Sequence, residues 1–379
     1  MSDLDGSAVA SLRRLNASKV LSVLRTEAYR KFTVREMSIA TGLSRPTVGR
    51  LLDDLVEVGW ALDVEGTPGS TGRPARRYWF NRLRGVIVSA DVGPGGAAIM
   101  ITDLVGSELA WVLEIGHEFT SVEIVVEYLL PAIDAQLERV RLDLGLAVHE
   151  LPVRAVSLAA PVMPGPDGTH IEVLSIVEGW RGASFLPALR EHFGEVPIHI
   201  NNDVALAAEA EMHVGALATA NQAVFCMLSS ACLMVLVHDG VVHLGSHHPA
   251  GDIGDLPEYA WKDAIFGALR DAGASPSNSV QAMVDAALAG EPAAVRASTQ
   301  LGTELARGIR DVAALWDPDT IVFAGQFPTV GPSFLGPIEE ALLELGGDDF
   351  DLRTTEVPED RGGCIGGTIK ALDAIDWTV

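Results

Sequence analysis

The chain of 379 residues has little cysteine, few aromatic residues and no long hydrophobic run. Its three cysteines, Cys226, Cys232 and Cys364, form no CxxC pair and stand among apolar or glycine neighbours, which is typical of buried free thiols. No apolar run approaches the roughly 20 residues that cross a bilayer, and the opening segment MSDLDGSAVA lacks the apolar core of a signal peptide. These absences argue against disulfide-rich secreted and membrane-spanning proteins and predict a cytoplasmic one.

Basic residues are also scarce, and they are unevenly placed. Residues 1–84 hold 14 of the 27 Lys and Arg but only 9 of the 51 Asp and Glu, so this segment has a net charge of +5 and the remainder −29. A polyanion would be attracted to the N-terminal segment and repelled by the rest of the chain. The split predicts a small nucleic-acid-binding module on a larger acidic body.

A pair of short helices is predicted within the basic segment. Thr33 can cap the first, and Gly42 supplies the left-handed residue that ends it. Ser44 can cap the second, whose first turn holds Pro46. The second helix has one apolar stripe, made of Val48, Leu51, Leu52, Leu55 and Val58, and we expect Arg45, Thr47 and Arg50 to point outward.

This pattern fits either a DNA-binding helix-turn-helix or an ordinary helical hairpin with a solvated face. Its surroundings favour the first interpretation. A preceding helix is predicted over Leu12–Ala28, with Leu15, Val20, Leu21 and Leu24 inward, and a following hairpin over 61–81 carries Arg73, Arg76 and Arg77. A basic hairpin beside a recognition helix is a wing, so residues 1–83 are predicted to form a winged helix-turn-helix. Its expected DNA contacts are Ser44, Arg45, Thr47, Arg50, Arg73 and Arg76.

Residues 84–379 show the same sequence of predicted elements twice. Three short strands precede helices and further strands after residue 86, and again after residue 223. This repetition predicts a duplicated α/β body with two lobes, and a ligand would bind between them. We place lobe one at about 84–202 plus a closing helix over Thr368–Ile375, and lobe two at about 203–365. The glycine-rich RGGCIGG before the closing helix is predicted to be a turn.

Several motifs along the chain, taken together, resemble the ROK family (repressors, uncharacterised frames and sugar kinases), in its transcription-regulator branch. TGLSRPTV and TGRPA match the branch's helix-turn-helix and wing, and DVGPGG, NND, AGDIG and DPDTIVFAG follow in the family's order. The resemblance covers nearly the whole chain. It implies an actin/hexokinase-like, sugar-kinase-type α/β body, a homodimer or dimer of dimers, and a sugar or sugar-derivative effector.

The resemblance also assigns ligand-binding residues to the body. Asp203 aligns with the family's catalytic base, and the resemblance implies that Asn202 hydrogen-bonds the sugar. Asp252 and Asp255 fall in the AGDIGD segment, which corresponds to the family's sugar-binding AGExGH. A carboxylate at a strand end can accept a proton from a sugar hydroxyl. The alternative is that Asn202 and Asp203 only cap the following helix.

The phosphate-binding segments of the family's kinases are altered here. The first loop reads DVGPGG, in which Pro94 removes a backbone donor, and Ser229-Ser230-Ala231-Cys232 replaces a glycine turn. Asp252 is shorter than the family's Glu, and Asp255 replaces a histidine. We therefore expect no catalytic residue, Asp203 being a degenerate candidate, and no ATP cofactor.

No metal is expected either. The family's zinc signature CxCGxxGC is missing, and the spacing of His238, His243, His247 and His248 matches no strong ligand motif. The sequence thus predicts a DNA-binding regulator, in the first place a repressor, whose degenerate kinase-like body dimerises and senses a small molecule. Two alternatives stay open: an active sugar kinase carrying a DNA-binding module, and a regulator that no longer senses sugar.

Overall fold

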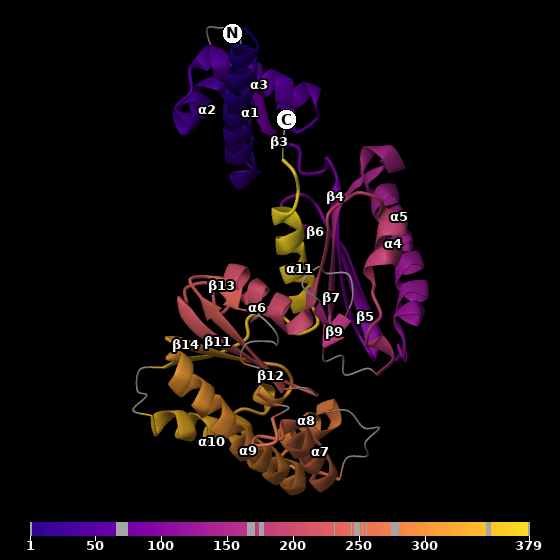
Figure 1. Cartoon of the computed structure of the whole chain (residues 1–379), viewed down its shortest axis with the longest axis vertical. Coiled ribbons are helices and arrows are strands. Elements are labelled where there is room, and N and C mark those ends of the chain that lie inside the picture. The colour runs from indigo at the N-terminus through magenta and orange to yellow at the C-terminus, as the bar shows by residue number, and fades with distance from the viewer. Residues whose placement is uncertain are drawn as a thin grey trace.

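A computed structural model describes residues 2–65, 75–164, 171–173, 178–230, 232–243, 245, 251, 253–254, 256–273, 280–345 and 350–377. Figure 1 shows three bodies arranged along the long axis: a helical module that carries the N-terminus and two α/β units. None of the helices in these ranges combines the length and apolar character that a bilayer crossing demands.

The N-terminal module is a three-helix core with a small sheet. Its elements are α1 (Ser2–Thr26), β1 (Phe32–Thr33), α2 (Val34–Thr41), α3 (Arg45–Glu57), β2 (Ala61–Val64) and β3 (Arg77–Phe80), and the strands pair in the order β1-β3-β2. Thr33 and Glu36 form a capping box at α2, and Gly42 ends that helix at φ 71°. This is the winged helix-turn-helix arrangement that the sequence predicts.

Two side chains predicted to be inward are exposed. Leu15 is 67% exposed, because the buried face of α1 is formed by Ala17, Val20, Leu21 and Leu24 instead. Val58 is 44% exposed, since α3 ends at Glu57 and Val58 is its C-cap. Both predictions extended an apolar stripe beyond the part of the helix that packs on the module's core.

The first α/β unit is built on a five-stranded sheet with the order β10-β7-β4-β5-β6. Strands β4, β5 and β6 form the antiparallel meander, and β7 and β10 add to it in parallel. The elements are β4 (Val86–Gly93), β5 (Gly96–Thr102), β6 (Glu108–Ile115), α4 (Val122–Leu144), η1 (Val148–Glu150), β7 (Val153–Ala160), β8 (Met163–Pro164), β9 (Ile171–Val173), η2 (Glu178–Trp180), α5 (Leu186–Phe193) and β10 (Ile198–Asn202).

The second unit repeats this plan with the order β13-β12-β11-β14-β15. Again a three-stranded antiparallel meander is extended by two parallel strands. Its elements are β11 (Gln222–Leu228), β12 (Cys232–His238), β13 (Val241–His243), α7 (Trp261–Asp271), α8 (Val280–Leu288), α9 (Pro292–Trp316), β14 (Thr320–Ala324), η3 (Phe327–Val330), α10 (Pro332–Leu343) and β15 (Asp351–Thr354). The predicted duplicated α/β fold is confirmed.

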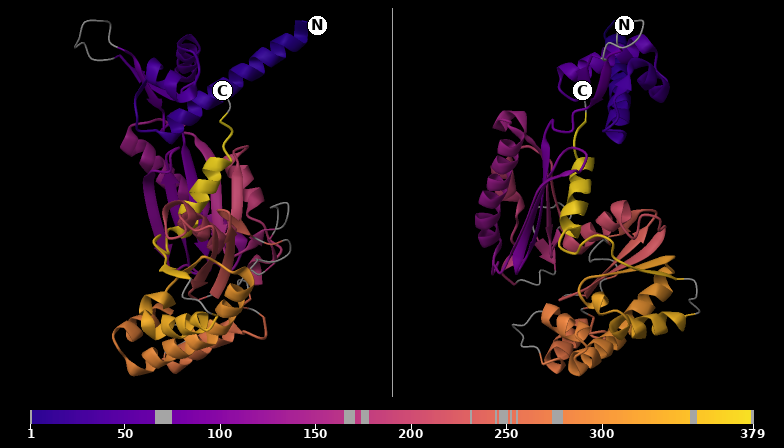
Figure 2. Two further views of the ribbon diagram at one scale, coloured as in Figure 1. Left: turned by 90° about the vertical axis from the view of Figure 1, so that its left-hand side faces the viewer. Right: turned by 180° about the vertical axis from the view of Figure 1, so that it is seen from behind.

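Two helices lie between the sheets, namely α6 (Asp203–Val214) and α11 (Gly362–Asp373). Helix α6 packs on the second sheet, where Val204, Ala207 and Ala208 join a core with Phe225 and Val322. Helix α11 lies against the first sheet, on the face opposite α4 and α5 (Figures 1 and 2).

The glycine-rich segment RGGCIGG is helical, so the prediction of a turn there is wrong. Helix α11 begins at Gly362 and ends at Asp373. Tertiary contact overrides the low helix propensity of glycine, because its neighbours leave no room for side chains. A Cβ on Gly366 would lie 1.8 Å from the Leu206 carbonyl oxygen, and one on Gly363 would lie 2.2 Å from an Asp91 carboxylate oxygen.

Candidate DNA-binding surface and carboxylate pair

The predicted recognition helix α3 has a buried face and an exposed basic one. Val48, Leu51, Leu52 and Leu55 are buried in the module's core, while Arg45 and Arg50 are exposed near the N-terminus of α3. Charged side chains at that end of an exposed helix can reach base edges and phosphates in a major groove.

The hydroxyls of Ser44 and Thr47 hold the start of α3. Ser44 is the N-cap and accepts from the Thr47 amide at 3.4 Å, and the two hydroxyl oxygens lie 2.8 Å apart. Arg50 Nε donates to the Pro46 carbonyl oxygen at 3.3 Å, which fixes its stem and leaves its outer nitrogens exposed. Local hydrogen bonds thus order Ser44, Thr47 and Arg50 at the start of α3.

Arg76, predicted to contact DNA, is held by carboxylates of its own module. Its Nη1 lies 2.7 Å from Asp53 on α3 and its Nε lies 2.5 Å from Asp63 on β2. Tyr78 also donates to Asp53, at 3.1 Å. Arg76 therefore fastens the base of the wing to the recognition helix. Arg73 lies outside the described residues.

Asp203 has a neighbour that sequence reasoning missed. Asp91 lies two residues before the end of β4, the central strand of the first sheet, close enough for its carboxylate to be repelled by that of Asp203 at the start of α6. Burial raises the pKa of Asp91 to about 8, and the nearby Asp203 adds to the rise. Burial raises the pKa of Asp203 to about 6, although the Val204 amide, which donates to Asp203 at 2.9 Å, opposes the shift. The signal was an aspartate placed between a buried strand and a glycine turn.

Asn202 is mainly a helix cap. Its Oδ1 accepts from the Ala205 amide at 3.1 Å, and its Nδ2 donates to the Val162 carbonyl at 3.4 Å. The capping alternative therefore describes Asn202, whereas the Asp203 carboxylate sits beside Asp91. Asp252 and Asp255, the other predicted ligand residues, lie outside the described residues.

Both altered phosphate segments make polar contacts within the chain. The Pro94 and Gly95 carbonyls accept from the Phe119 and Gly116 amides at 3.1 and 2.9 Å. In the second segment, the Ser229 hydroxyl donates to Gln326 at 3.5 Å and interacts with the Glu359 carboxylate. An acidic side chain therefore stands beside the hairpin that would have to receive a phosphate.

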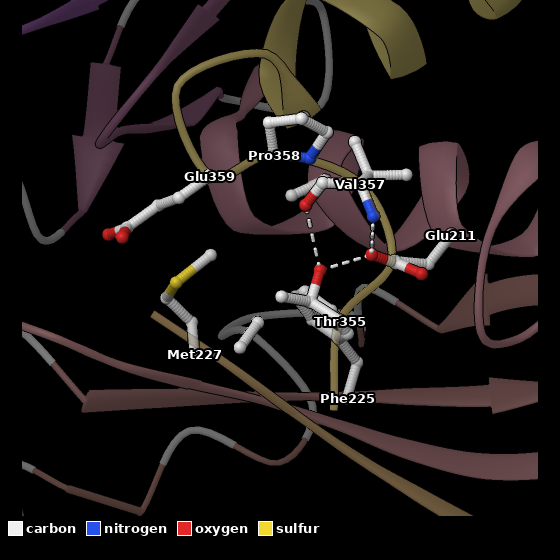
Figure 3. A pocket seen from close by; sticks show the side chains of 10 residues that line it. Glu211, Phe225, Met227, Thr355, Val357, Pro358 and Glu359 are labelled. Atoms are coloured by element: carbon white, nitrogen blue, oxygen red, sulfur yellow. Dashed lines mark hydrogen bonds between the residues drawn. The ribbon is translucent and has the colours of Figure 1, made fainter. Parts of the chain in front are cut away.

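A small cavity lies beside α6, lined by ten residues of which Figure 3 labels seven. Its volume of about 10 Å³ is room for one water and not for a sugar or nucleotide. Glu211 of α6 dominates its polar wall: one oxygen accepts from the Thr355 hydroxyl and from the Glu356 and Val357 amides, the latter two at 3.1 and 2.8 Å. A wider groove of about 560 Å³ between α7 and α9 includes neither Asp91 nor Asp203.

Two of the four histidines considered for metal binding lie in the described part of the chain. His238 and His243 pack their rings near Trp316, with centroids 6.2 and 5.7 Å from it. His247 and His248 lie outside the described residues. Within the part of the chain that the structure describes, no three His, Cys, Asp or Glu side chains gather in a way that could hold a metal ion.

Known proteins share this arrangement. No family model matches the chain. It is 21% identical over 326 residues to the xylose repressor of Bacillus spizizenii, covering 81% of each protein. A crystal structure of a ROK family transcriptional regulator, a homolog of the E. coli MLC protein, superposes with a TM-score of 0.69 at 20% identity, over 95% of this chain and 96% of that one. The chain has the ROK fold.

The ROK fold also includes kinases, and these match less of the chain. A ROK family glucokinase from Streptomyces griseus, solved with glucose and AMPPNP, superposes with a TM-score of 0.59 at 17% identity, over 76% of this chain and 100% of that one. The regulator structure extends over nearly the whole chain, whereas the kinase leaves about a quarter of it unmatched. The predicted resemblance to the ROK family is confirmed at the level of the fold, and the regulator structure matches more of the chain than the kinase does.

The paired aspartates predict an unusual pH dependence of stability. Between about pH 4 and pH 8 the unfolded chain loses the protons that folded Asp91 and Asp203 keep, so the pair lowers the free energy of unfolding as pH rises through this window. We expect Asp91→Asn to be more stable than the wild type at about pH 8.5 and to lose most of this advantage at about pH 5.5, measured by urea denaturation.

The exposed Asp143 on α4 supplies the matched control for this experiment. Asp143→Asn should change stability little and equally at both pH values, because surface substitutions seldom matter. If the difference in stability between Asp91→Asn and the wild type does not vary with pH, the pKa values of the two carboxyl groups are not raised in the folded chain.

Proposed function

We propose that this chain is a cytoplasmic DNA-binding transcriptional repressor of the ROK type, which binds double-stranded DNA as a homodimer or dimer of dimers. The observation that carries the proposal is the exposed pair Arg45 and Arg50 on a capped helix α3, in a basic module on an acidic body. A solved ROK regulator with the same overall arrangement and a relative named as a xylose repressor support it.

The body is proposed to sense a sugar or sugar derivative. Asp203, with Asp91 beside it, and the nearby Asn202 form the described part of that site, and Asp252 and Asp255 are proposed to complete it. Residues 1–83 are proposed as the DNA-binding domain, with Arg73 reaching DNA from the wing, and residues 84–379 as the two-lobed body.

Salt dependence of DNA binding tests the main proposal. The full chain should bind a labelled duplex from its own upstream region in fluorescence anisotropy. If the complex neutralises about six phosphates, its affinity should fall roughly 10³-fold between 50 and 200 mM salt. A scrambled duplex of equal length should bind more weakly at every salt concentration. Absent binding, or binding that is indifferent to salt, would refute a DNA-binding function.

An active sugar kinase is the second candidate, because Asp203 and the glucokinase match favour it. The missing backbone donor at Pro94 and the acidic Glu359 beside Ser229 oppose nucleotide binding. We infer that the chain does not transfer phosphate. A coupled assay of ATP consumption across hexoses and N-acetyl sugars should give no turnover, and sugar-dependent turnover that Asp203→Asn abolishes would establish the kinase instead.

A further inference from the structure

Helix α11 connects the paired aspartates to the winged helix-turn-helix. It starts beside Asp91 and runs along the first sheet toward the N-terminal module, where Trp377, beyond the end of α11, lies against Phe80 of β3 (Figures 1 and 2). The residues that bring these two sites together are far apart in the sequence, so their contacts are a product of the fold.

The N-terminal half of α11 is locked against α6 and the first sheet. Gly366 touches the backbone of α6 at Leu206, and Gly367 lies against the Ser157 side chain of β7, where a Cβ would come 2.7 Å from the hydroxyl. The Thr368 and Ser89 hydroxyls lie 2.9 Å apart in the core. Close backbone packing of this kind leaves helices no slack, so a displacement of α6 must displace α11.

Polar contacts fasten the same two helices. Lys370 Nζ of α11 lies 2.5 Å from the Glu209 carboxylate of α6, whose side chain is 6% exposed. Glu211, two residues further along α6, holds the segment that leads into α11. Helices α6 and α11 therefore behave as one unit, and Asp203 is the first residue of α6.

The far end of this unit is clamped inside the N-terminal module. The Trp377 ring lies 3.5 Å beneath the Arg25 guanidinium of α1, and its centroid is 5.4 Å from that of Trp60 and 6.2 Å from that of Phe80. Its Nε1 donates back to the Leu372 carbonyl at 3.3 Å, which holds the ring against the end of α11. Ala371 and Ile375 belong to the same hydrophobic core as Val20 and Leu24.

We propose that Trp377 is a positioning residue for the winged helix-turn-helix, and that α11 transmits movements of α6 at the Asp91–Asp203 pair to that module. The biological meaning of this inference rests on the proposed function, whereas the mechanical claim does not. Other contacts also join the module to the first unit, among them Arg82 with buried Asp103 at 2.5 Å, Tyr29 with Ser107 at 2.6 Å, and the Arg154 guanidinium over the Trp60 ring at 5.4 Å. Loss of Trp377 should therefore loosen the module without detaching it.

Electron-spin distance measurements on the full chain test the proposal. Cysteines introduced at exposed Glu57 of the module and Glu138 of α4 can be spin-labelled selectively, because the three native cysteines are buried. We expect a narrow distance distribution in the parent chain and one about twofold broader in Trp377→Ala, since the aromatic clamp is gone. Trp377→Phe should stay close to the parent, and Trp79→Ala, a half-buried tryptophan outside this clamp, should not broaden it.

A second substitution acts at the other end of α11. Gly366→Ala places a methyl group against the Leu206 carbonyl and should push α11 away from α6, which shifts the mean distance between the same two labels. Gly336→Ala on α10 is the matched control, because a Cβ there meets nothing within 4 Å. If Gly366→Ala does not fold, Lys370→Met removes the ion pair to Glu209 without adding bulk to the helix contact.

Two results would overturn the inference. A folded Trp377→Ala chain with an unchanged distribution would show that Trp377 does not position the module. Unchanged distances in the folded α11 variant would show that α11 does not transmit movement. Neither measurement requires DNA, so a failure of the proposed regulator function in the DNA-binding assay is distinguished from a failure here.

Discussion

Replacing Arg45 and Arg50 together with alanine is expected to weaken binding of the full chain to its operator about 100-fold or more, since each arginine that reaches a base or phosphate contributes about 1–3 kcal/mol. Both side chains are exposed on α3, so the fold should not change. Anisotropy titrations at several salt concentrations measure the loss of affinity. The slope of log affinity against log salt concentration should become shallower by about one for each phosphate contact removed.

Lysine substitutions at the same positions separate two roles. A lysine keeps the charge and should largely restore a phosphate contact, but it does not restore a two-pronged contact to guanine. Arg296→Ala, an exposed arginine on α9 of the second unit, is the matched control and should leave affinity unchanged. An unweakened double variant would place the DNA-binding surface elsewhere.

Glu211→Ala is expected to lower the free energy of unfolding by about 3–5 kcal/mol, because it strands two buried amides, of Val357 and Ala216, and two part-buried donors at once. The side chain is 1% exposed and its second oxygen accepts from the Ala216 amide at 2.5 Å, in addition to the contacts in Figure 3. Urea denaturation of the full chain measures the change. Glu211→Gln should cost less, since it keeps the volume and one acceptor oxygen.

Glu339→Ala on α10 removes an exposed glutamate and is the control for this substitution. It should change stability by no more than about 0.5 kcal/mol. A Glu211→Ala chain as stable as the control would mean that water replaces the carboxylate in the cavity beside α6, whose volume allows one molecule.

Local signals in the sequence were sufficient for the N-terminal module. The caps at Thr33 and Ser44, the left-handed Gly42 and the stripe from Val48 to Leu55 depend on neighbours within a few residues, and all are present in the structure. Where a helix no longer packs on the core, the same periodicity wrongly predicts burial, as at Leu15 and Val58. The duplicated meanders were predictable for the same local reason.

Features that depend on distant segments could not be predicted. Nothing near Asp203 in the sequence indicates Asp91, and nothing near Arg76 indicates that Asp53 would neutralise it. The helix at Gly362–Asp373 is the strongest case, because its four glycines locally predict a turn and become helical only where the α6 backbone and side chains of the first sheet press against them. Side-chain pairing across the chain requires the fold first.

The attachment of the winged helix-turn-helix to the end of α11 has a consequence for synthesis of the protein. Its clamp joins Trp60 to Trp377, and the core beneath it joins Ser89 to Thr368, which are 279 residues apart. At translation rates of about 5–20 residues per second, the module leaves the ribosome roughly 15–60 s before Trp377 is made. A nascent chain can thus expose a folded winged helix that is held only by its contacts with the first unit, and the clamp around Trp377 is the last of its contacts to form.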